Sequence, residues 1–201
     1  RTAGVRAGEV VAVHAERAPA LVWTLLGVLK AGAAFTVLDP SQPASRLAAQ
    51  LAAASPAAWV NVDPARRPAG EVLAALARLP AGEIAPAGAC VPAECPAASD
   101  GVVPSGHSPA YVAFTSGTTG GTKAVLGTHG PVAHFVEWQG RTFRLSAADR
   151  FSLLSGLAHD PMLRDIFTPL SIGAAVCVPP ASAMLEPDAL AEYLIRERIT
   201  V

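Results

Sequence analysis

The stretch that decides the fold is Tyr111 to Gly127, which reads Tyr-Val-Ala-Phe-Thr-Ser-Gly-Thr-Thr-Gly-Gly-Thr-Lys-Ala-Val-Leu-Gly. Its first five residues alternate and are rich in aromatic and β-branched types, which predicts a strand over Tyr111 to Thr115. A second strand is expected over Lys123 to Gly127, so that the two strands form a hairpin. The residues between them, Ser116 to Thr122, are glycines and hydroxyl-bearing residues and predict a turn.

This turn has the chemistry of an anion site. Glycines allow successive backbone N–H groups to point into one concavity, hydroxyls add donors, and Lys123 adds a mobile positive charge. Two common phosphate motifs do not fit, because Thr122 stands where GxxxxGK[ST] needs a glycine and the segment has no GxGxxG. A flexible polar hairpin is the alternative interpretation.

The same stretch resembles the phosphate-binding loop of the adenylate-forming superfamily, usually written YxxFTSGTTGxPKGV. This superfamily contains nonribosomal peptide synthetase adenylation domains, acyl-CoA synthetases and luciferases. Thr122 and Ala124 replace the family's proline and glycine. The resemblance implies that Lys123 is catalytic and that ATP phosphates bind to Thr115, Ser116, Gly117, Thr118, Thr119, Gly120 and Lys123.

Strands and helices alternate before the hairpin. This order favours parallel strands joined by crossover helices, an arrangement in which ligands collect at the carboxyl ends of the strands. The stretch Leu29 to Leu47 also resembles a second adenylation-domain signature, LKAGxAYVPLDPxxPxxRL. The expected strands are Glu9 to His14, Ala33 to Leu38 and Ala57 to Val62, and the expected helices are Ala18 to Ala31 and Pro43 to Ala54.

The segment from Asp63 to Pro109 changes composition to Pro, Ala and Gly and contains one amphipathic helix, at Glu71 to Leu79. We expect a variable surface excursion within one domain. A linker between domains is the alternative, but strand and helix alternation resumes in the same style after the segment.

Alternation continues after the hairpin, so the whole chain is expected to have an alternating α/β fold. Asp160 followed by Pro161 signals a helix start, with Asp160 as the N-cap and Pro161 as the first helical residue. Apolar residues then recur at helical spacing. The other expected elements are helices over Pro131 to Gln139 and Pro187 to Arg196, and strands over Asp149 to Ser155 and Ala174 to Val178.

Asp160 and Arg164 have a structural explanation and a functional one. A helix cap and a surface ion pair four residues apart would account for both. The segment Gly156 to Leu170, however, resembles the FDxSxxEIF segment of amino-acid-activating adenylation domains, in its aminoadipate reductase version. This implies that Asp160 holds the substrate's α-ammonium group, and that Pro161 and Arg164 line the side-chain pocket, where the arginine could pair with a substrate carboxylate. His129 and His159 are further candidates near the pocket.

Composition and charge bound the partners. The 201 residues carry a formal net charge of −1, so no large basic field exists to attract nucleic acid or an anionic membrane. The most apolar segment, Ala20 to Leu38, is interrupted by Lys30, and the start of the chain does not resemble a signal peptide. A cytoplasmic location is therefore expected. The three cysteines are odd in number and lack CxxC spacing, so neither a disulfide nor a bound structural metal is expected.

The sequence thus predicts part of the N-terminal subdomain of an amino-acid adenylation domain, spanning residues 1–201, without the C-terminal subdomain and inactive alone. The resemblance implies ATP and Mg²⁺ as cofactors, an amino acid or amino dicarboxylic acid as substrate, and a carrier-protein domain with phosphopantetheine as acceptor. Alternatives are an acyl-CoA or fatty-acyl ligase and a non-catalytic module. A hydrolase using Ser116 with His129 or His159 and Asp160 lacks the GxSxG elbow.

Overall fold

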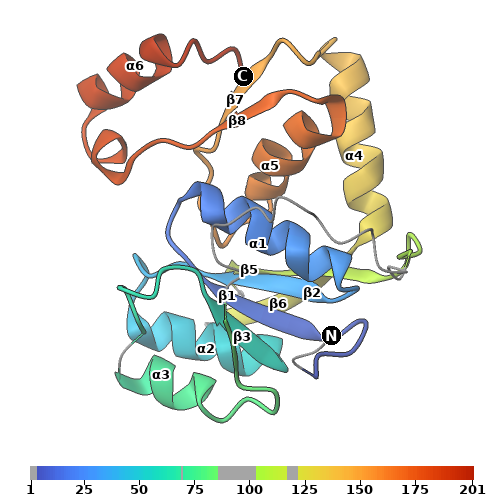
Figure 1. The fold of residues 1–201 in the computed structure, drawn as a ribbon, viewed down its shortest axis with the longest axis vertical. Coiled ribbons are helices and arrows are strands. Elements are labelled where there is room, and N and C mark those ends of the chain that lie inside the picture. The colour runs from blue at the N-terminus through green and yellow to red at the C-terminus, as the bar shows by residue number, and fades with distance from the viewer. Residues whose placement is uncertain (1–3, 69, 86–102, 117–121) are drawn as a thin grey trace. The chain divides into compact units, whose positions relative to one another are not determined.

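The computed structural model describes residues 4–68, 70–85, 103–116 and 122–201, and these form two compact units (Figure 1). The first unit comprises Arg1–Glu16 with Ala20–His129, and the second comprises Arg17–Pro19 with Gly130–Val201. Each unit has its own sheet. The predicted alternating α/β fold is confirmed, and its strands are divided between a six-stranded and a two-stranded sheet.

The first unit is built on a mostly parallel sheet with the order β4-β3-β1-β2-β5-β6. Neighbouring strands run parallel except at β5 and β6, which form the predicted antiparallel hairpin. Apolar, β-branched runs suit such strands because both faces of a parallel sheet are covered, and every residue of β2 is buried. The strands are β1 (Val10–His14), β2 (Ala34–Leu38), β3 (Ala58–Asn61), β4 (Glu83–Ile84), β5 (Pro109–Ser116) and β6 (Thr122–Thr128).

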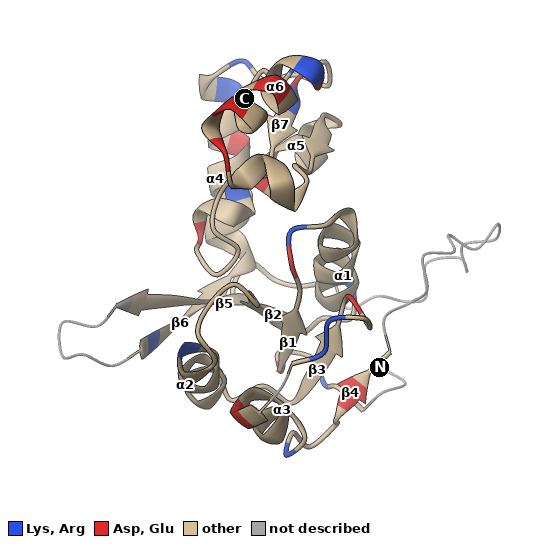
Figure 2. Ribbon diagram, turned by 90° about the vertical axis from the view of Figure 1, so that its left-hand side faces the viewer, with Lys and Arg blue, Asp and Glu red and all other residues tan. Residues whose placement is uncertain are grey.

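Helices cover both faces of this sheet, with α1 (Pro19–Lys30) on one face and α2 (Ala44–Ala54) and α3 (Gly70–Leu76) on the other (Figures 1 and 2). In α1, Leu21 and Leu25 are fully buried. Side chains of three strands pack against α2 and α3 to form one apolar core: Ala12, Leu38, Leu47, Leu51, Trp59, Val72 and Leu76.

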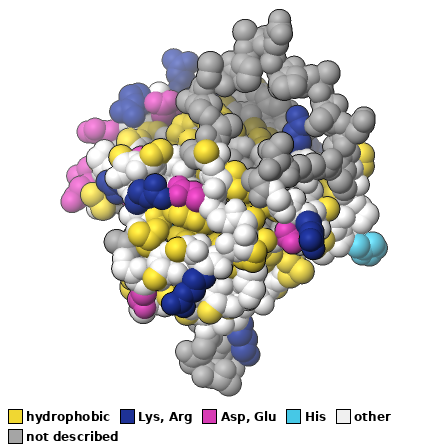
Figure 3. Space-filling view, turned by 60° about the horizontal axis from the view of Figure 1, so that its bottom comes forward, with side chains coloured by type: hydrophobic (Ala, Val, Ile, Leu, Met, Phe, Trp, Pro, Cys, Tyr) yellow, Lys and Arg dark blue, Asp and Glu magenta, His cyan; other side chains and the backbone are white. Residues whose placement is uncertain are grey.

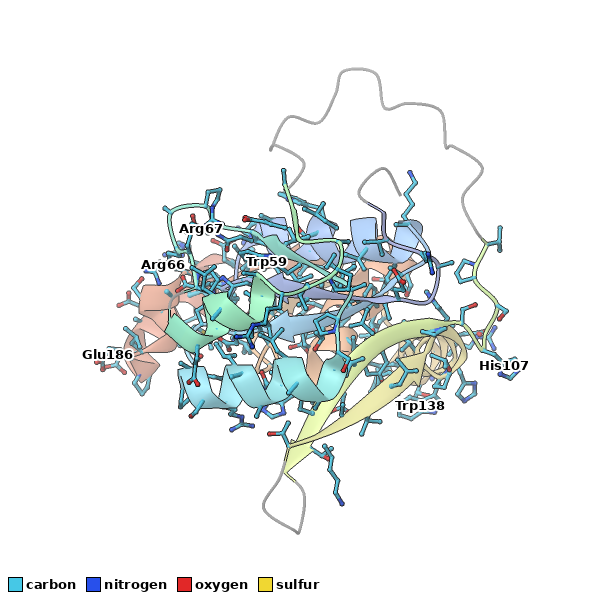
Figure 4. All side chains as sticks on the ribbon, turned by 90° about the horizontal axis from the view of Figure 1, so that it is seen from below. Trp59, Arg66, Arg67, His107, Trp138 and Glu186 are labelled. Atoms are coloured by element: carbon cyan, nitrogen blue, oxygen red, sulfur yellow. The ribbon has the colours of Figure 1, made fainter. Side chains whose placement is uncertain are left out.

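The two-residue strand β4 was not predicted, because it is too short to show a period. Its register pairs Glu83 with Trp59 of β3. Arg67 reinforces this contact: it forms an ion pair with Glu83, and its Cζ lies 5.9 Å from the centre of the Trp59 ring (Figure 4). The segment 63–109 therefore contributes the helix α3 and an edge strand to the sheet.

The second unit is built on two parallel strands, β7 (Arg150–Ser152) and β8 (Ala175–Cys177), joined by the helix α5 (Pro161–Ile172). The strand β7 ends earlier than predicted because the chain turns at once, with the N–H of Leu154 donating to the carbonyl of Ser152 at 3.0 Å. The other elements are α4 (His129–Thr142), the short helix η1 (Ala181–Met184) and α6 (Pro187–Arg196).

Two buried contacts join the helices of this unit to one another and to the sheet. The hydroxyl of Thr168 in α5 donates to Gln139 Oε1 in α4 at 2.7 Å. Tyr193 in α6 packs with Cys177 of β8 and Ala183 of η1. Burial raises the pKa of the Cys177 thiol, so this cysteine stays protonated and behaves as a small apolar side chain.

The hairpin residue Gly127 gives a first testable prediction. Gly127 stands opposite Tyr111 in the register, and a Cβ at position 127 would come 2.1 Å from Tyr111 Cε1. We expect Gly127→Ala to destabilise the protein by about 1 kcal/mol or more, because the ring must leave its place. Thermal unfolding of the full-length protein measures this loss.

The matched control is Gly27→Ala in α1, where an added Cβ meets no described atom within 4 Å. Alanine favours a helix interior over glycine by about 1 kcal/mol, so this variant should unfold at the same or a higher temperature. An unchanged unfolding temperature for Gly127→Ala would mean that the Tyr111 ring repacks without cost.

Candidate functional site

The first unit carries the predicted phosphate-binding loop at the tip of the β5–β6 hairpin. In the register of this hairpin Thr115 stands opposite Lys123, and Ser116 opposite Thr122. Thr122 and Ala124, which depart from the family pattern, leave the strand pairing uninterrupted. Of the predicted loop residues, Gly117, Thr118, Thr119 and Gly120 lie outside the described residues, as does the side chain of Ser116.

Lys123 is the basic residue of β6, coloured blue in Figure 2. Its side chain is exposed, as is that of Thr115 across the hairpin. Within the described ranges Lys123 has neither an ion pair nor a side-chain hydrogen bond. The hairpin therefore ends in an ammonium group whose charge is not neutralised and a hydroxyl donor, a combination suited to phosphate oxygens.

The second unit carries Asp160 and Pro161 at the predicted start of α5. Asp160 stands at the N-cap position with Pro161 after it, as predicted, but the expected side-chain cap is missing: Asp160 has helical dihedrals, φ −57° and ψ −30°, and its side chain makes no cap hydrogen bond to the described chain. Backbone carbonyls take over, because the N–H of Met162 donates to the carbonyl of His159 and the N–H of Leu163 to that of Asp160. The exposed carboxylate of Asp160 thus has no structural task within the described residues.

Arg164 lies one turn further along α5, but the alternative of a surface pair between Asp160 and Arg164 is not what the structure contains. Arg164 Nε instead contacts Asp165 Oδ1 at 3.1 Å, and Nη2 lies 3.5 Å from Ser155 Oγ. The arginine side chain is 46% exposed and that of Asp165 only 9%, so the buried carboxylate is the stronger electrostatic partner.

Two residues of this site were missed in the sequence. Asp165 lies on the buried face of α5 and accepts the N–H of Ser155 on Oδ2 at 3.0 Å. Arg17, which belongs to this unit, donates through Nη1 to the carbonyls of Leu153 and Ser155. The signal for Asp165 was available, because a charged residue interrupts the apolar face of the helix.

The histidines lie in different surroundings. Burial lowers the pKa of the His129 imidazole below its ordinary value, so the ring is neutral at pH 7. His159 is exposed, and its ring lies beside Gly156, where an added Cβ would come 2.9 Å from Cδ2. Their roles in a substrate pocket stay predictions.

The remaining surface is mixed in charge. On the face shown in Figure 3, basic and acidic side chains are interspersed. Two exposed ion pairs of the first unit, Arg66 with Glu16 and Arg67 with Glu83, hold opposite charges in contact. None of the helices in the described ranges has the length and apolar character that a membrane crossing requires. Nor do His, Cys, Asp and Glu side chains of those ranges gather in a group of three that could hold a metal ion.

Comparison with known proteins agrees with the resemblance to adenylate-forming enzymes that the sequence shows. The profile of the family described as "AMP-binding enzyme" matches residues 1–201. L-2-aminoadipate reductase of Schizosaccharomyces pombe (strain 972 / ATCC 24843) is 36% identical over 219 residues, which cover 98% of this chain and 15% of the reductase. The chain thus spans a small part of the length of this curated relative.

Solved structures similar to this chain include a nonribosomal peptide synthetase. Two crystal structures of the nonribosomal peptide synthetase FmoA3 each match 98% of this chain with a TM-score of 0.76. One is bound to α-methyl-L-serine-AMP, is 30% identical and has 21% of its chain covered. The other is bound to AMPPNP, is 31% identical and has 20% of its chain covered.

Proposed function

This chain belongs to the family of AMP-binding enzymes, and we propose that it takes part in activating an amino acid as its aminoacyl-AMP. Two relatives support an amino acid over another carboxylic acid: a reductase named for L-2-aminoadipate, and a synthetase whose structure holds an amino-acid adenylate. At 30% identity or more they are similar proteins and not equivalents, so the chain's own residues must supply the rest of the argument.

The observation that carries the proposal is the carboxylate of Asp160. It is exposed at the start of α5 and forms no cap hydrogen bond within the described chain. An ammonium group is its natural partner, because opposite charges in contact form the stronger class of hydrogen bond. An acyl-CoA or fatty-acyl ligase would have no α-ammonium to hold and would not need this anion.

The hairpin supports ATP as the second substrate. The uncompensated ammonium of Lys123 and the exposed hydroxyl of Thr115 stand opposite each other at its tip, and both can donate to phosphate oxygens. Mg²⁺ would arrive with the phosphates, since it is usually held by one or two protein oxygens together with substrate phosphates. The ion would supply neutralisation of charge on those oxygens.

The proposed reaction has two steps. A carboxylate oxygen of the amino acid attacks the α-phosphorus of ATP, the bond to pyrophosphate breaks, and aminoacyl-AMP forms. The thiolate of a carrier domain's phosphopantetheine then attacks the acyl carbon, and AMP leaves with the oxygen. The protein's contribution to the first step is positioning and charge neutralisation, for which Lys123 and Asp160 are the candidates.

Amino-acid-dependent exchange of labelled pyrophosphate into ATP tests the proposal in the full-length protein. We expect exchange with one amino acid, or a few related ones, from a panel that includes neutral amino acids and amino dicarboxylic acids. Fatty acids supporting exchange in their place would favour the acyl ligase. ATP binding without any exchange would favour a non-catalytic module.

Arg164 yields a prediction on substrate class. If its guanidinium meets a second carboxylate, Arg164→Ala should lower kcat/KM for an amino dicarboxylic acid by about 1 to 2 kcal/mol relative to a neutral amino acid. The loss is smaller than the roughly 3 to 5 kcal/mol of a fully buried pair, because the side chain is half exposed. Competing exchange assays with the two substrate classes measure the ratio.

Arg196→Ala is the matched control, because Arg196, the last residue of α6, forms the same kind of pair with the next residue, Glu197, at 3.3 Å. This variant should leave the ratio unchanged. If Arg164→Ala lowers kcat/KM equally for both substrate classes, Arg164 does not bind a second substrate carboxylate, and its role is its contact with Asp165.

A further inference from the structure

Residues 153–160 link β7 to α5, and this segment ends at the proposed ammonium ligand, Asp160. Its beginning is held from two sides. Arg17 Nη1 donates to the carbonyl of Leu153 at 2.7 Å and to that of Ser155 at 2.9 Å. On the other side, the N–H of Ser155 donates to Asp165 Oδ2 at 3.0 Å.

The contact with Asp165 closes the segment into a loop fixed on one helix. Asp165 is buried and lies on the same helix that begins where the segment ends. The end is fixed as well, because the N–H of Leu163 donates to the carbonyl of Asp160 at 2.9 Å. The position of Asp160 therefore depends on where Ser155 is held.

The contacts of Arg17 and Asp165 with residues 153 and 155 form a clamp, and Arg17 is well suited to its side of it. The sharp turn after β7 takes the carbonyls of Leu153 and Ser155 out of the strand ladder, and the Leu153 side chain is fully buried. Carbonyls in such surroundings need donors, and the planar guanidinium supplies several in a fixed geometry. Arg17 lies 136 residues before Leu153, so the clamp joins distant parts of the chain within the second unit.

We infer that Arg17 and Asp165 are positioning residues for amino-acid binding: together they fix Ser155 and through it the segment that carries Asp160. The inference rests on the proposed role of Asp160. Neither residue is required to touch the substrate. Their effect should be large because displacing a binding group by about 1 Å can cost about 100-fold in rate.

The test compares Arg17→Gln, Arg17→Lys, Asp165→Asn and the double variant Arg17→Gln with Asp165→Asn in the full-length protein. The matched control is Arg150→Gln, because Arg150 Nε also donates to a distant backbone carbonyl, that of Glu197, in the same unit. Pyrophosphate exchange gives KM for the amino acid and for ATP separately, and hydrogen exchange reports on residues 153–160.

We expect Arg17→Gln and Asp165→Asn each to raise KM for the amino acid by about tenfold or more, with KM for ATP within about twofold of the wild type. Arg17→Lys should recover part of the loss, since an ammonium can also donate to both carbonyls. In the double variant, KM for the amino acid should rise no more than it does in the more impaired of the two single variants, because both residues act through Ser155. Arg150→Gln should leave both KM values unchanged.

Hydrogen exchange of residues 153–160 should accelerate about tenfold in Arg17→Gln and in Asp165→Asn but not in Arg150→Gln. Unchanged protection of this segment would overturn the inference, as would losses that multiply in the double variant or an equal rise of both KM values. If the wild type shows no amino-acid-dependent exchange, the proposed function fails, and the hydrogen-exchange comparison still decides whether Arg17 and Asp165 hold the segment.

Discussion

Replacing Asp160 with asparagine should lower kcat/KM for the amino acid by about 2 to 5 kcal/mol, which is about 30-fold to several thousand-fold. Asparagine keeps the size and one oxygen of the aspartate but removes the charge that would face the α-ammonium. The stability of the protein should hardly change, because Asp160 has helical dihedrals and makes no cap bond within the described chain. Exchange kinetics and thermal unfolding, measured on the same preparation, separate the two effects.

Glu186→Gln is the matched control for this substitution. Glu186 precedes Pro187 at the start of α6 as Asp160 precedes Pro161 at the start of α5, and neither side chain caps its helix in the described structure. Figure 4 labels Glu186. Loss of this second charge should leave exchange unaffected. Comparable activity losses in both variants would mean that Asp160 acts through the general field of the surface and not as a ligand.

The regular part of the fold could be predicted because it depends on local patterns. Apolar runs predicted β1, β2 and β3 within about a residue at each end, and the glycine-rich turn predicted the hairpin. The helix predicted over Pro187 to Arg196 has the same bounds as α6, with proline at its start. These signals lie within a few residues of the feature that they predict.

What the sequence could not supply depends on residues far apart in the chain. The strand β4 exists because Glu83 meets Trp59 and Arg67, and no pattern within two residues shows this. The division of the alternating strands between two sheets is likewise a matter of which strands pair, which periodicity does not determine. A turn also moved one predicted end: the strand expected to run to Ser155 stops at Ser152, where β7 ends.

The candidate site divides in the same way. The neighbours of Asp160 in the sequence suggested its role, which stays a prediction, but they did not show its surroundings: Arg164 contacts Asp165 in preference to Asp160. Arg17 follows Glu16 in the sequence and would be taken for half of a solvated charge pair. Only the fold brings its guanidinium to the carbonyls of Leu153 and Ser155.

Lys123 provides the second large effect. We expect Lys123→Ala to lower kcat/KM for ATP by about 1.5 to 3 kcal/mol, or about 10- to 150-fold, the amount associated with one charge-assisted hydrogen bond. KM for the amino acid should be unchanged, since Asp160 is left intact. The fold should tolerate the change, because the side chain is exposed and has no ion pair within the described ranges.

The control is Lys30→Ala, which removes an exposed lysine from the last turn of α1. It changes the net charge by the same amount but leaves the hairpin intact, so ATP kinetics should stay those of the wild type. Lys123→Arg adds a test of geometry, because a guanidinium retains the charge but has a different shape and donor arrangement. Full activity in Lys123→Ala would show that the exposed ammonium does not meet the phosphates, and the turn would then be a polar hairpin alone. Partial recovery by arginine would assign the effect to charge, and failure of arginine to recover activity would assign it to the placement of the ammonium.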